Sequence, residues 1–364
     1  MMNKAYKFRI YPTLEQEVLL AKTFGCVRFI YNKMLDDKIK YYEETKKKLN
    51  NTPAQYKQEF EWLKEVDSLA LANAQLHLQT AYNNFFRDKK VGFPKFKSKK
   101  KNYQSYTTNY VNGNIKLEKD YLILPKVKAV KLKQHRNIPD NYKLKSVTIS
   151  KTATNKYYAS ILFEFEQDIK QVKPQNFIGL DFSMNELYVA SNNTKANYPR
   201  YYRLSLVKLA KEQRKLSKMK KGSKNRNKQR IKVARLHEKV SNQRKDFLHK
   251  LSRQITNAYD CVCIEDLNMQ GMSQALHFGK TVADDSWGTF TNMLAYKLQE
   301  QGKQIVKIDK YFPSSKMCSH CGNVKETLSL SERIYSCDTC GTVIDRDYNA
   351  SINIKNEGMR IVLA

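Results

Sequence analysis

The chain has 364 residues, with 66 Lys and Arg against 35 Asp and Glu, and its formal net charge at pH 7 is +31. Hydrophobic residues make up 41% of it, which excludes a wholly disordered chain and a minimal disulfide scaffold and allows about two or three domains. So large an excess of positive charge is not typical of an enzyme of small substrates. It predicts a polyanionic partner, most simply nucleic acid.

Cysteine use and apolar patterning bear on the compartment. No apolar run approaches the roughly 18 residues needed to span a membrane, and the first residues lack the apolar core of a signal peptide. We therefore expect no membrane partner and a cytoplasmic protein. Four of the seven cysteines form two C-x-x-C pairs, which in a protein that is not secreted indicates metal binding rather than disulfides. The other three thiols, Cys26, Cys261 and Cys263, fit a reducing compartment.

The first part of the chain is predicted to be a strand followed by a helical block. Alternating apolar residues predict the strand at residues 5–11. Thr13 and Gln16 form a capping box at the start of a helix, which we expect Gly25 to interrupt. The apolar face of this helix is predicted to carry Leu14, Val18 and Ala21. Apolar residues at helical spacing carry the block to about residue 108, among them Leu69, Leu76 and Phe86.

The next part is predicted to be a small antiparallel barrel. Short alternating runs separated by turn residues are typical of closely spaced antiparallel strands. These runs lie at residues 114–117, 121–124, 127–133, 146–150 and 158–165. The strand at residues 5–11 can belong to the same barrel, in which case the helical block is an insertion.

After a linker at residues 170–175, the pattern changes to an α/β layer. It comprises a hairpin of buried strands at 176–181 and 186–191, a basic helical stretch from about Leu204, and strands at 260–265 and 304–309 around a helix at 290–301. A hairpin followed by alternating helix and strand predicts a mixed sheet. The expected fold class is thus a multidomain chain with α/β and α+β parts.

Two C-x-x-C pairs predict a zinc ribbon at residues 313–341. Fifteen residues separate the pairs, which offer a tetrahedral Zn²⁺ ion four thiolates: Cys318, Cys321, Cys337 and Cys340. Gly322 and Gly341 follow the pairs, where a metal knuckle needs backbone freedom. His320 could replace a thiolate, but its place inside the first knuckle favours an outward side chain. The ion is predicted to be structural; the alternative is four unrelated cysteines in a reducing cell.

Three acidic residues are candidates for a divalent metal site. Asp181 and Glu265 each close a buried strand, and Asp347 lies where a C-terminal helix should start. Strand ends are where sites assemble in α/β sheets. Carboxylates brought together there repel one another unless a cation such as Mg²⁺ or Mn²⁺ binds, and two such ions can hydrolyse a phosphodiester. Each residue alone also has an ordinary alternative: a turn for Asp181, a sheet-edge ion pair for Glu265 and a helix cap for Asp347.

Two basic segments are candidate nucleic-acid surfaces. Residues 203–253 carry 19 Lys and Arg against three acids and are predicted to form two helices joined by a turn at residues 221–223. A solvated charged hairpin is the alternative, but a face of one charge sign repels itself unless a polyanion covers it. The candidate phosphate contacts are Arg214, Lys215, Lys220, Lys221, Lys224, Arg226, Lys228 and Arg230.

The second basic segment is residues 87–101, with tyrosines at Tyr103, Tyr106 and Tyr110. Cations for phosphates next to aromatic rings for stacking suit RNA or single strands, and the candidate contacts are Lys95, Lys97 and Lys99. Residues 268–287 are expected to form either a mobile loop over the acidic site or a plain connector.

Four motifs, taken together, resemble one known family. They are Ile178-Gly-Leu-Asp181, Ile264-Glu-Asp-Leu-Asn268, the run from Pro313 to Gly322, and Asp345-Arg-Asp-Tyr-Asn-Ala-Ser351. In this order they resemble the TnpB, or OrfB-type, transposon-encoded proteins, which are relatives of type V CRISPR effectors. The resemblance spans nearly the whole chain.

The resemblance implies a domain plan and a function. Residues 1–12 and 109–172 would form a β-barrel-like wedge domain, and residues 13–108 a helical recognition insertion. Residues 173–312 and 342–364 would form a RuvC nuclease domain of RNase H-like fold, interrupted by the zinc ribbon. The implied activity is Mg²⁺-dependent cleavage of double-stranded DNA that is complementary to a bound guide RNA and lies next to a short motif, in a nucleoid-associated protein of a prokaryotic cell. The family positions that hold the metal correspond to Asp181, Glu265 and Asp347.

One departure and three alternatives remain. The family usually has Gly where this chain has Ser183, which bears on the turn after Asp181. The alternatives are a transposase that cuts transposon ends itself, a nuclease-inactive RNA-guided regulator, and a DNA-binding regulator that uses residues 14–35 as a helix-turn-helix.

Overall fold

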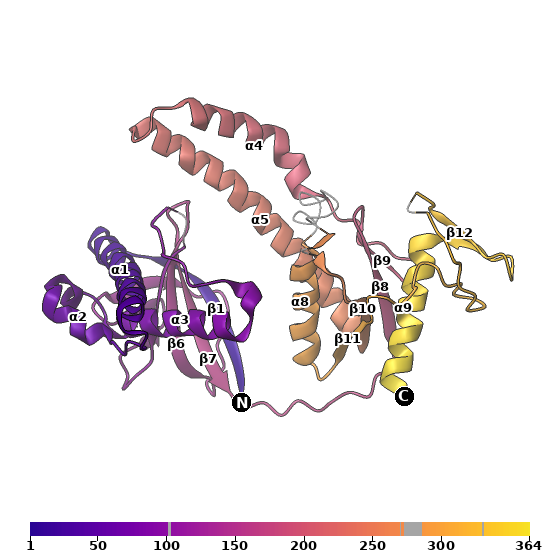
Figure 1. The fold of residues 1–364 in the computed structure, drawn as a ribbon, viewed down its shortest axis with the longest axis horizontal. Coiled ribbons are helices and arrows are strands. Elements are labelled where there is room, and N and C mark those ends of the chain that lie inside the picture. The colour runs from indigo at the N-terminus through magenta and orange to yellow at the C-terminus, as the bar shows by residue number, and fades with distance from the viewer. Residues whose placement is uncertain (101–102, 270, 273–285, 330) are drawn as a thin grey trace. The chain divides into compact units, whose positions relative to one another are not determined.

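The computed structural model describes residues 1–100, 103–269, 271–272, 286–329 and 331–364. The chain divides into two compact units, Met1–Gln167 and Asp168–Ala364 (Figure 1). The boundary lies at the predicted linker. Among the described residues, the helices are too short or too polar to cross a membrane.

The first unit combines an antiparallel sheet with helices. Its helices are α1 (Leu14–Thr45), α2 (Pro53–Glu59) and α3 (Ser68–Arg87), with 3₁₀ turns at Glu61–Glu65 and Lys89–Val91. Its strands are β1 (Met2–Tyr11), β2 (Gln104–Asn109), β3 (Lys116–Glu118), β4 (Tyr121–Leu124), β5 (Lys128–Lys133), β6 (Lys143–Lys151) and β7 (Tyr157–Phe165). They pair in the order β2-β6-β7-β1-β5-β4-β3.

The prediction that the first strand belongs to the same sheet is confirmed, because β1 pairs with both β5 and β7. The predicted closure into a barrel is not seen: in the described part of the chain the sheet is curled but open, with β2 and β3 at its edges. The helices are thus inserted in the chain between β1 and β2, two strands of one sheet that are separated within it by β7 and β6.

The capping box at Thr13 is confirmed, with the Thr13 nitrogen donating to Gln16 Oε1 at 3.0 Å. Two other expectations for this helix are wrong. α1 runs unbroken through Gly25, and no atom of the described residues outside its own helical turn lies within 4 Å of a Cβ position there. The roughly 1 kcal/mol cost of one helical Gly is outweighed by the packing of the helix. The predicted face is exposed, 84% at Leu14, because the stripe that meets the sheet starts later, at Leu20, Phe24, Val27, Ile30 and Met34.

The predicted helical block also ends too late. Its last residues form β2, whose two-residue alternation buries Tyr106 and Thr108 but is too short to stand out beside the helical spacing before it. In α3, Leu76 and Phe86 are exposed, at 54% and 76%. The buried face carries other residues instead: Ala70, Leu71, Ala74 and Leu78.

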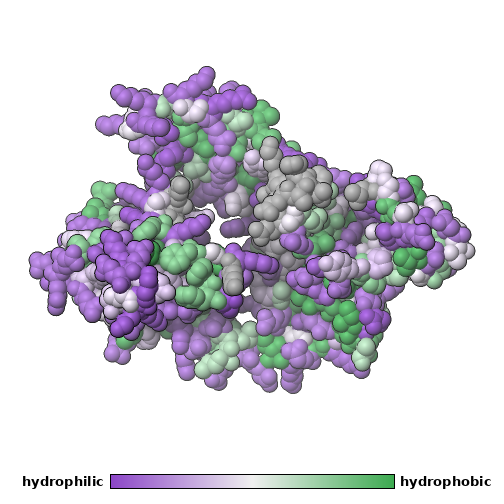
Figure 2. Space-filling model, in the orientation of Figure 1, coloured by the Kyte–Doolittle hydropathy of each residue, from purple (hydrophilic) through white to green (hydrophobic). Residues whose placement is uncertain are grey.

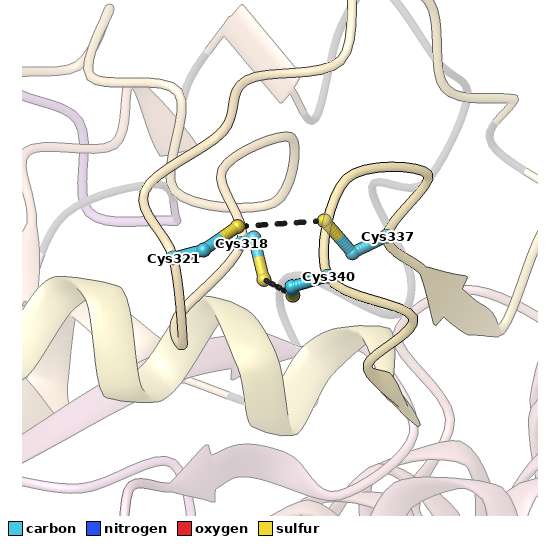
Figure 3. Close-up of side chains that lie close together, drawn as sticks. All are labelled: Cys318, Cys321, Cys337 and Cys340. Carbon is cyan, nitrogen blue, oxygen red and sulfur yellow. Dashed lines mark hydrogen bonds between the residues drawn. The ribbon is translucent and has the colours of Figure 1, made fainter.

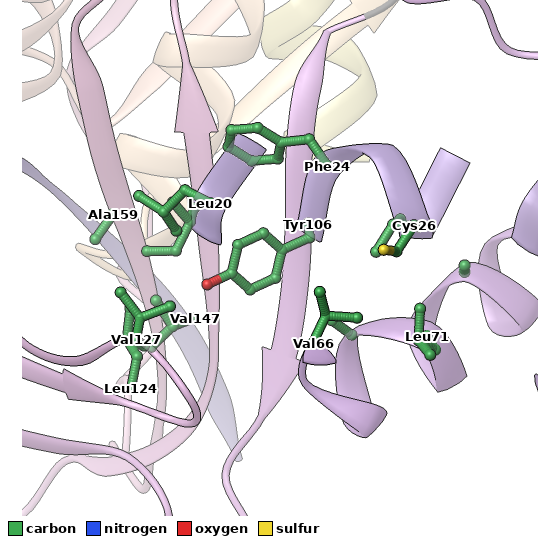
Figure 4. Close-up of a cluster of buried hydrophobic side chains, with 14 of the residues drawn as sticks. Leu20, Phe24, Cys26, Val66, Leu71, Tyr106, Leu124, Val127, Val147 and Ala159 are labelled. Atoms are coloured by element: carbon green, nitrogen blue, oxygen red, sulfur yellow. The ribbon is translucent and has the colours of Figure 1, made fainter. Parts of the chain in front are cut away.

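Tyr106 lies in the core of the first unit (Figure 4). It is 3% exposed, and its ring centroid is 5.8 Å from that of Phe24. Burial raises the pKa of its hydroxyl. The expectation that Tyr106 offers a stacking surface to a base is therefore wrong, whereas Tyr103 and Tyr110 are exposed.

The second unit contains the predicted mixed sheet. Its strands are β8 (Phe177–Ser183), β9 (Leu187–Ala190), β10 (Cys261–Glu265) and β11 (Gln304–Ile308), in the order β11-β10-β8-β9. β10 is parallel to both neighbours, and β8 and β9 form the antiparallel hairpin. The helices with defined bounds among its described residues are α4 (Tyr201–Lys218), α5 (Lys224–Ala258), α8 (Trp287–Gln299) and α9 (Arg346–Leu363). A small pair, β12 (Ile334–Ser336) and β13 (Val343–Asp345), belongs to the cysteine segment.

The two faces of this sheet are covered by different helices. Ile178 and Ile264 pack in one apolar cluster with residues of α5 and α8. The alternate residues point the other way: a Cβ on Gly179 would meet the backbone of α9, and the Cys263 sulfur lies where a Cβ on Gly358 of α9 would stand. Since side chains alternate along a strand, every second residue of β8 and β10 faces α9.

Candidate metal and nucleic-acid sites

This alternation places two of the predicted acids on one face of the sheet. Gly179 and Cys263 are paired in register and both face α9. Asp181 and Glu265 each follow two residues later, so their side chains project from the same face at the carboxyl ends of adjacent parallel strands. Asp181 is paired with Val189 inside β8, which removes the alternative that it is a turn residue.

Asp347 reaches this face from α9. It lies in the first turn of the helix, one turn before Ser351, whose carbonyl approaches Gly179. The helix cap is Asp345, whose Oδ1 accepts a hydrogen bond from the Tyr348 nitrogen at 2.9 Å. The alternative that Asp347 serves as the cap is therefore removed. Its Oδ1 lies 3.5 Å from Nη2 of Arg346.

Asp181 lies close enough to the other two acids for their charges to act on it. The pKa of Asp181 is raised well above its ordinary value by burial, and further by the negative charges of Glu265 and Asp347, with Arg346 opposing the shift. Burial also raises the pKa of Glu265, which a hydrogen bond from Ser314 partly offsets. Glu265 lies on a central strand, so it is no sheet-edge ion pair; its neighbour Asp266 is the one that pairs with a lysine, Lys307, at 2.8 Å.

Such a group suits a hard divalent cation, because a cation relieves the mutual repulsion that burial makes costly. The ligand atoms of the three carboxylates nevertheless lie further apart than those of the cysteine group. Among the residues that the structure describes, only the four cysteines bring three or more ligand atoms within 4.8 Å of one another.

The four cysteines converge as predicted (Figure 3). The sulfur atoms of Cys318 and Cys340 lie 3.7 Å apart, and those of Cys321 and Cys337 lie 3.6 Å apart. Four thiolates about 2.3 Å from a tetrahedral ion would have sulfurs at nearly this separation, so the group fits zinc. His320 is exposed and outside the cluster.

Each pair of cysteines lies in the same kind of backbone turn. The Gly322 nitrogen donates to the Cys318 carbonyl at 2.9 Å, and the Gly341 nitrogen to the Cys337 carbonyl at 3.0 Å. Both glycines have φ above +70°, which only glycine adopts without strain. Hydrogen bonds from Thr342 lower the pKa of the Cys340 thiol to about 6, which favours the thiolate that a metal requires.

The basic segment forms the predicted helical hairpin, α4–α5, with Gly222 at the turn. Figure 2 shows mostly hydrophilic side chains over its upper part, with some hydrophobic ones among them. One acid of the hairpin is used internally: Glu212 is 5% exposed, accepts from Gln229 Nε2 at 2.6 Å and pairs with Lys232. Of the candidate cations of the hairpin, Arg226 is half-buried. The others are exposed: Arg214, Lys215, Lys220, Lys221, Lys224, Lys228 and Arg230.

The second basic segment behaves differently. Lys95 and Lys99 are exposed, but the Lys97 ammonium lies 3.9 Å from the centre of the Tyr31 ring, and burial lowers its pKa. The Lys97 nitrogen donates a hydrogen bond to Asn32 Oδ1, and the Lys97 carbonyl accepts one from Asn32 Nδ2, at 2.8 Å each. Lys97 is therefore part of the packing between this segment and α1.

Two further expectations concern the surroundings of the acids. The loop predicted over the site, residues 268–287, lies largely outside the described residues. Ser183 ends β8 without a positive φ, and its hydroxyl accepts from the Asn185 nitrogen at 3.4 Å. The turn after Asp181 is thus compatible with Ser in place of the family's usual Gly.

Sequence reasoning missed the residues that assemble the site. Gly179 and Gly358 allow α9 to approach the sheet, and Ser314 bonds to Glu265. A glycine in the middle of an apolar strand was the available signal, since such a residue marks a close backbone approach. The Ser314 contact spans 49 residues and leaves no periodic trace in the sequence.

Three family models match the chain. Residues 160–276 match a model described as "Probable transposase", residues 287–354 a "Cas12f1-like, TNB domain", and residues 1–47 a "Helix-turn-helix domain". The last description does not fit the structure, in which those residues form β1 and the unbroken helix α1. The alternative of a helix-turn-helix at residues 14–35 is therefore wrong.

Whole-length relatives agree with these matches. A protein of Streptomyces pristinaespiralis, whose name proposes an RNA-guided DNA endonuclease, is 35% identical over 98% of this chain and 90% of its own. InsQ of Escherichia coli K12, with the same proposed activity in its name, is 28% identical over 99% and 93%. The TnpB-like protein L770 of Acanthamoeba polyphaga mimivirus is 26% identical over 97% and 73%. The chain belongs to the TnpB family of RNA-guided DNA endonucleases and their relatives.

A solved structure extends the likeness to the fold. The chain aligns with Cas12f1, in a cryo-EM structure of the Cas12f1–sgRNA–target DNA complex, with a TM-score of 0.60 over 98% of this chain and 99% of that one. The sequence identity is 15%. The fold, with its mixed α/β content and curled sheet, is therefore Cas12f1-like.

Proposed function

We propose that this protein is an RNA-guided DNA endonuclease that requires Mg²⁺ or Mn²⁺. The observation that carries the proposal is the placement of Asp181 and Glu265 on one face, at the carboxyl ends of two adjacent parallel strands, with Asp347 in the first turn of the helix that packs on that face. The charges of Glu265 and Asp347 accordingly help to raise the pKa of Asp181. Membership of the TnpB family and the names of the relatives support the same activity.

In the proposed mechanism, three side chains hold the metal. Asp181 and Glu265 present carboxyl oxygens from adjacent strands, and Asp347 presents its own from the first turn of α9. Divalent ions bound there would supply the activation of water and the charge stabilisation that phosphodiester hydrolysis needs. The packing of α9 against Gly179 keeps the helical ligand close to the strand ligands.

The surfaces proposed for nucleic acid lie apart from these acids in sequence. The exposed cations of the α4–α5 hairpin would contact phosphates of the guide RNA or target DNA. Lys95 and Lys99 are proposed as further contacts, beside the exposed rings of Phe93 and Phe96. Lys97 is proposed to act on this surface only indirectly, through its packing on Tyr31.

The domain plan is proposed with one change. The wedge domain comprises β1 and β2 to β7, so that its second part begins at Gln104, with the helical recognition insertion between β1 and β2. The RuvC nuclease domain comprises the mixed sheet with its helices, and residues 313–341 form the zinc ribbon within it. The wedge and recognition parts are proposed to read the short motif beside the target.

Two alternatives make different predictions. A transposase acting on transposon ends, in keeping with the description of the matched family model, would choose its cutting site without RNA. A nuclease-inactive RNA-guided regulator would bind DNA without cutting it, although here all three carboxylates are present.

The deciding experiment exchanges the guide. The protein is expressed with its co-purifying RNA, the guide portion is replaced, and plasmids that carry the old or the new complementary site are incubated with Mg²⁺. Cleavage should move to the new site, and only where the flanking motif is kept, because base pairing supplies the sequence reading. Cleavage that stays at the original site would favour the transposase, and binding without cleavage the regulator.

A further inference from the structure

A hydroxyl group from outside the sheet holds one of the three acids. Ser314 lies between β11 and the first cysteine pair and is 6% exposed. Its Oγ donates a hydrogen bond to Oε1 of Glu265. One of the two carboxyl oxygens of Glu265 is thereby engaged, which restricts the rotation of the carboxyl group.

Two buried asparagines of α9 hold the segment that carries Ser314. Nδ2 of Asn353 donates to the carbonyls of Ser314, at 2.8 Å, and Met317, at 2.7 Å. Asn349, one turn earlier, donates to the Met317 carbonyl at 2.7 Å and accepts from the Ser319 nitrogen at 2.9 Å. Both asparagines are at most 1% exposed, so losing these partners would leave buried amides unsatisfied.

The same segment leads directly into the first cysteine turn. Cys318 follows Met317, and its nitrogen donates to the Asn323 carbonyl at 2.8 Å. α9 is thus hydrogen-bonded both to the segment that leads into the cysteine cluster and to the serine that bonds to Glu265. A change in the position of Cys318 has a short covalent and hydrogen-bonded route to Glu265.

We propose that Ser314 is a positioning residue for Glu265, and that the zinc ribbon acts on the acidic site through residues 314–318, which Asn349 and Asn353 attach to α9. The inference rests on the proposed function only in taking Glu265 as a ligand of the divalent cation. Hydrogen-bond partners of metal ligands orient the ligating atoms, and losing one typically costs about 10–100-fold in metal affinity or activity.

The first test measures Mn²⁺ binding by electron paramagnetic resonance, on full-length protein without nucleic acid. Ser314→Ala should weaken Mn²⁺ binding about 10–100-fold, with the zinc content and melting temperature retained, and Ser314→Thr should restore most of the affinity. The matched control is Ser315→Ala, since the Ser315 side chain forms no hydrogen bond with the residues that the structure describes. The Mn²⁺ affinity of this variant should equal that of wild type. Wild-type Mn²⁺ affinity in Ser314→Ala would overturn the positioning role.

The second test asks whether the ribbon acts through Ser314. Cys318→Ser should weaken Mn²⁺ binding in the wild-type background but add little in the Ser314→Ala background, because two changes on one route are not additive. Asn353→Ala, which keeps all four thiolates, covers the case in which Cys318→Ser fails to fold, and should behave in the same way. Fully additive losses would overturn this route.

These readouts separate the inference from the proposed function. Protein that binds Mn²⁺ in a Ser314-dependent way, yet cuts no guide-matched DNA, would refute the proposed function and leave the positioning role standing. If Ser314→Ala keeps both guide-directed cleavage and the wild-type Mn²⁺ affinity, the positioning role is refuted and the proposed function stands.

Discussion

Gly179 of β8 lies directly against the backbone of α9, so that a Cβ on it would stand 2.6 Å from the Lys355 nitrogen and closer still to the Ser351 carbonyl. Gly358 of the same helix lies against the Cys263 side chain in the same way. Two glycines therefore set how closely α9 approaches the sheet, and with it how close Asp347 comes to Asp181.

The first prediction follows from this contact. Gly179→Ala should push α9 away from β8 and lower the free energy of unfolding by about 1–3 kcal/mol or more, as overpacking of a core does. Cleavage should fall further than guide-RNA binding, because the acids separate while the basic hairpin is untouched. Urea unfolding and plasmid cleavage measure the two effects. Gly288→Ala is the control: among the described residues beyond its chain neighbours and its own helical turn, no atom lies within 4 Å of that Cβ position, so stability should hold or rise slightly.

The second prediction concerns the three acids. Asp181→Ala, Glu265→Ala and Asp347→Ala should each abolish cleavage by removing a ligand of the divalent cation, while RNA and DNA binding survive, because phosphate contacts dominate affinity. Plasmid cleavage and a filter-binding assay on the purified variants measure this.

The control for the acids is Asp266→Asn. Asp266 adjoins Glu265 but is exposed and pairs with Lys307, so cleavage should stay near the wild-type rate. Cutting at the wild-type rate by any one of the three alanine variants would exclude that residue from the catalytic role.

The third prediction concerns a buried lysine between α8 and α5. Lys297 is 3% exposed, donates to the Ser252 hydroxyl at 2.6 Å and to the His249 carbonyl at 2.7 Å, and has its pKa lowered to about 8 by burial. Between pH 8 and about 10.4 the unfolded chain holds a proton that the folded protein has released. Stability should therefore rise with pH in this window, by up to about 1.4 kcal/mol per unit, relative to Lys297→Met.

Chemical denaturation of the two proteins across this pH range provides the measurement. Other groups titrate there as well, but they contribute equally to both proteins, so the difference between the curves isolates Lys297. Parallel curves would mean that Lys297 keeps its charge inside the folded protein.

The fourth prediction concerns zinc. The purified protein should contain about one zinc ion per chain, and Cys318→Ser or Cys340→Ser should lose it and unfold the ribbon locally, since zinc binding is coupled to folding. Cleavage should fall as well, because α9 is bonded through Asn349 to the first cysteine turn. Elemental analysis and cleavage assays test this, and zinc-free wild type with full activity would contradict it.

The parts of the fold that local chemistry determines were predictable. Local residue types determine the backbone conformation at three places: the capping box at Thr13, the turn at Gly222, and the glycines after each cysteine pair. The acids could be chosen as candidates because each closes an apolar strand or opens a helix. The three-residue spacing of the cysteines likewise predicts their cluster.

What the sequence hides is the choice of face and the long-range contact. Leu14 and Leu76 have helical spacing, yet they are exposed, because the sheet meets a neighbouring face of each helix. β2 was hidden because its register depends on β6, which lies some forty residues further on. Ser314 reaches Glu265 only once the strands and α9 are assembled.

The last prediction concerns the hairpin. Lys220, Lys221 and Lys224 are exposed around its turn, while Glu212, the acid nearest to them in sequence, is occupied by Gln229 and Lys232. Replacing all three lysines by Gln should weaken RNA binding. It should also flatten the dependence of log affinity on log salt by about 0.7–0.9 for each phosphate that the variant no longer neutralises, because fewer counterions are released. Lys250→Gln, at the far end of α5, removes a lysine that is already paired with Asp246 at 2.7 Å and should leave the slope nearly unchanged. Titrations at several salt concentrations compare the two, and an unchanged slope in the triple variant would place the RNA on another surface.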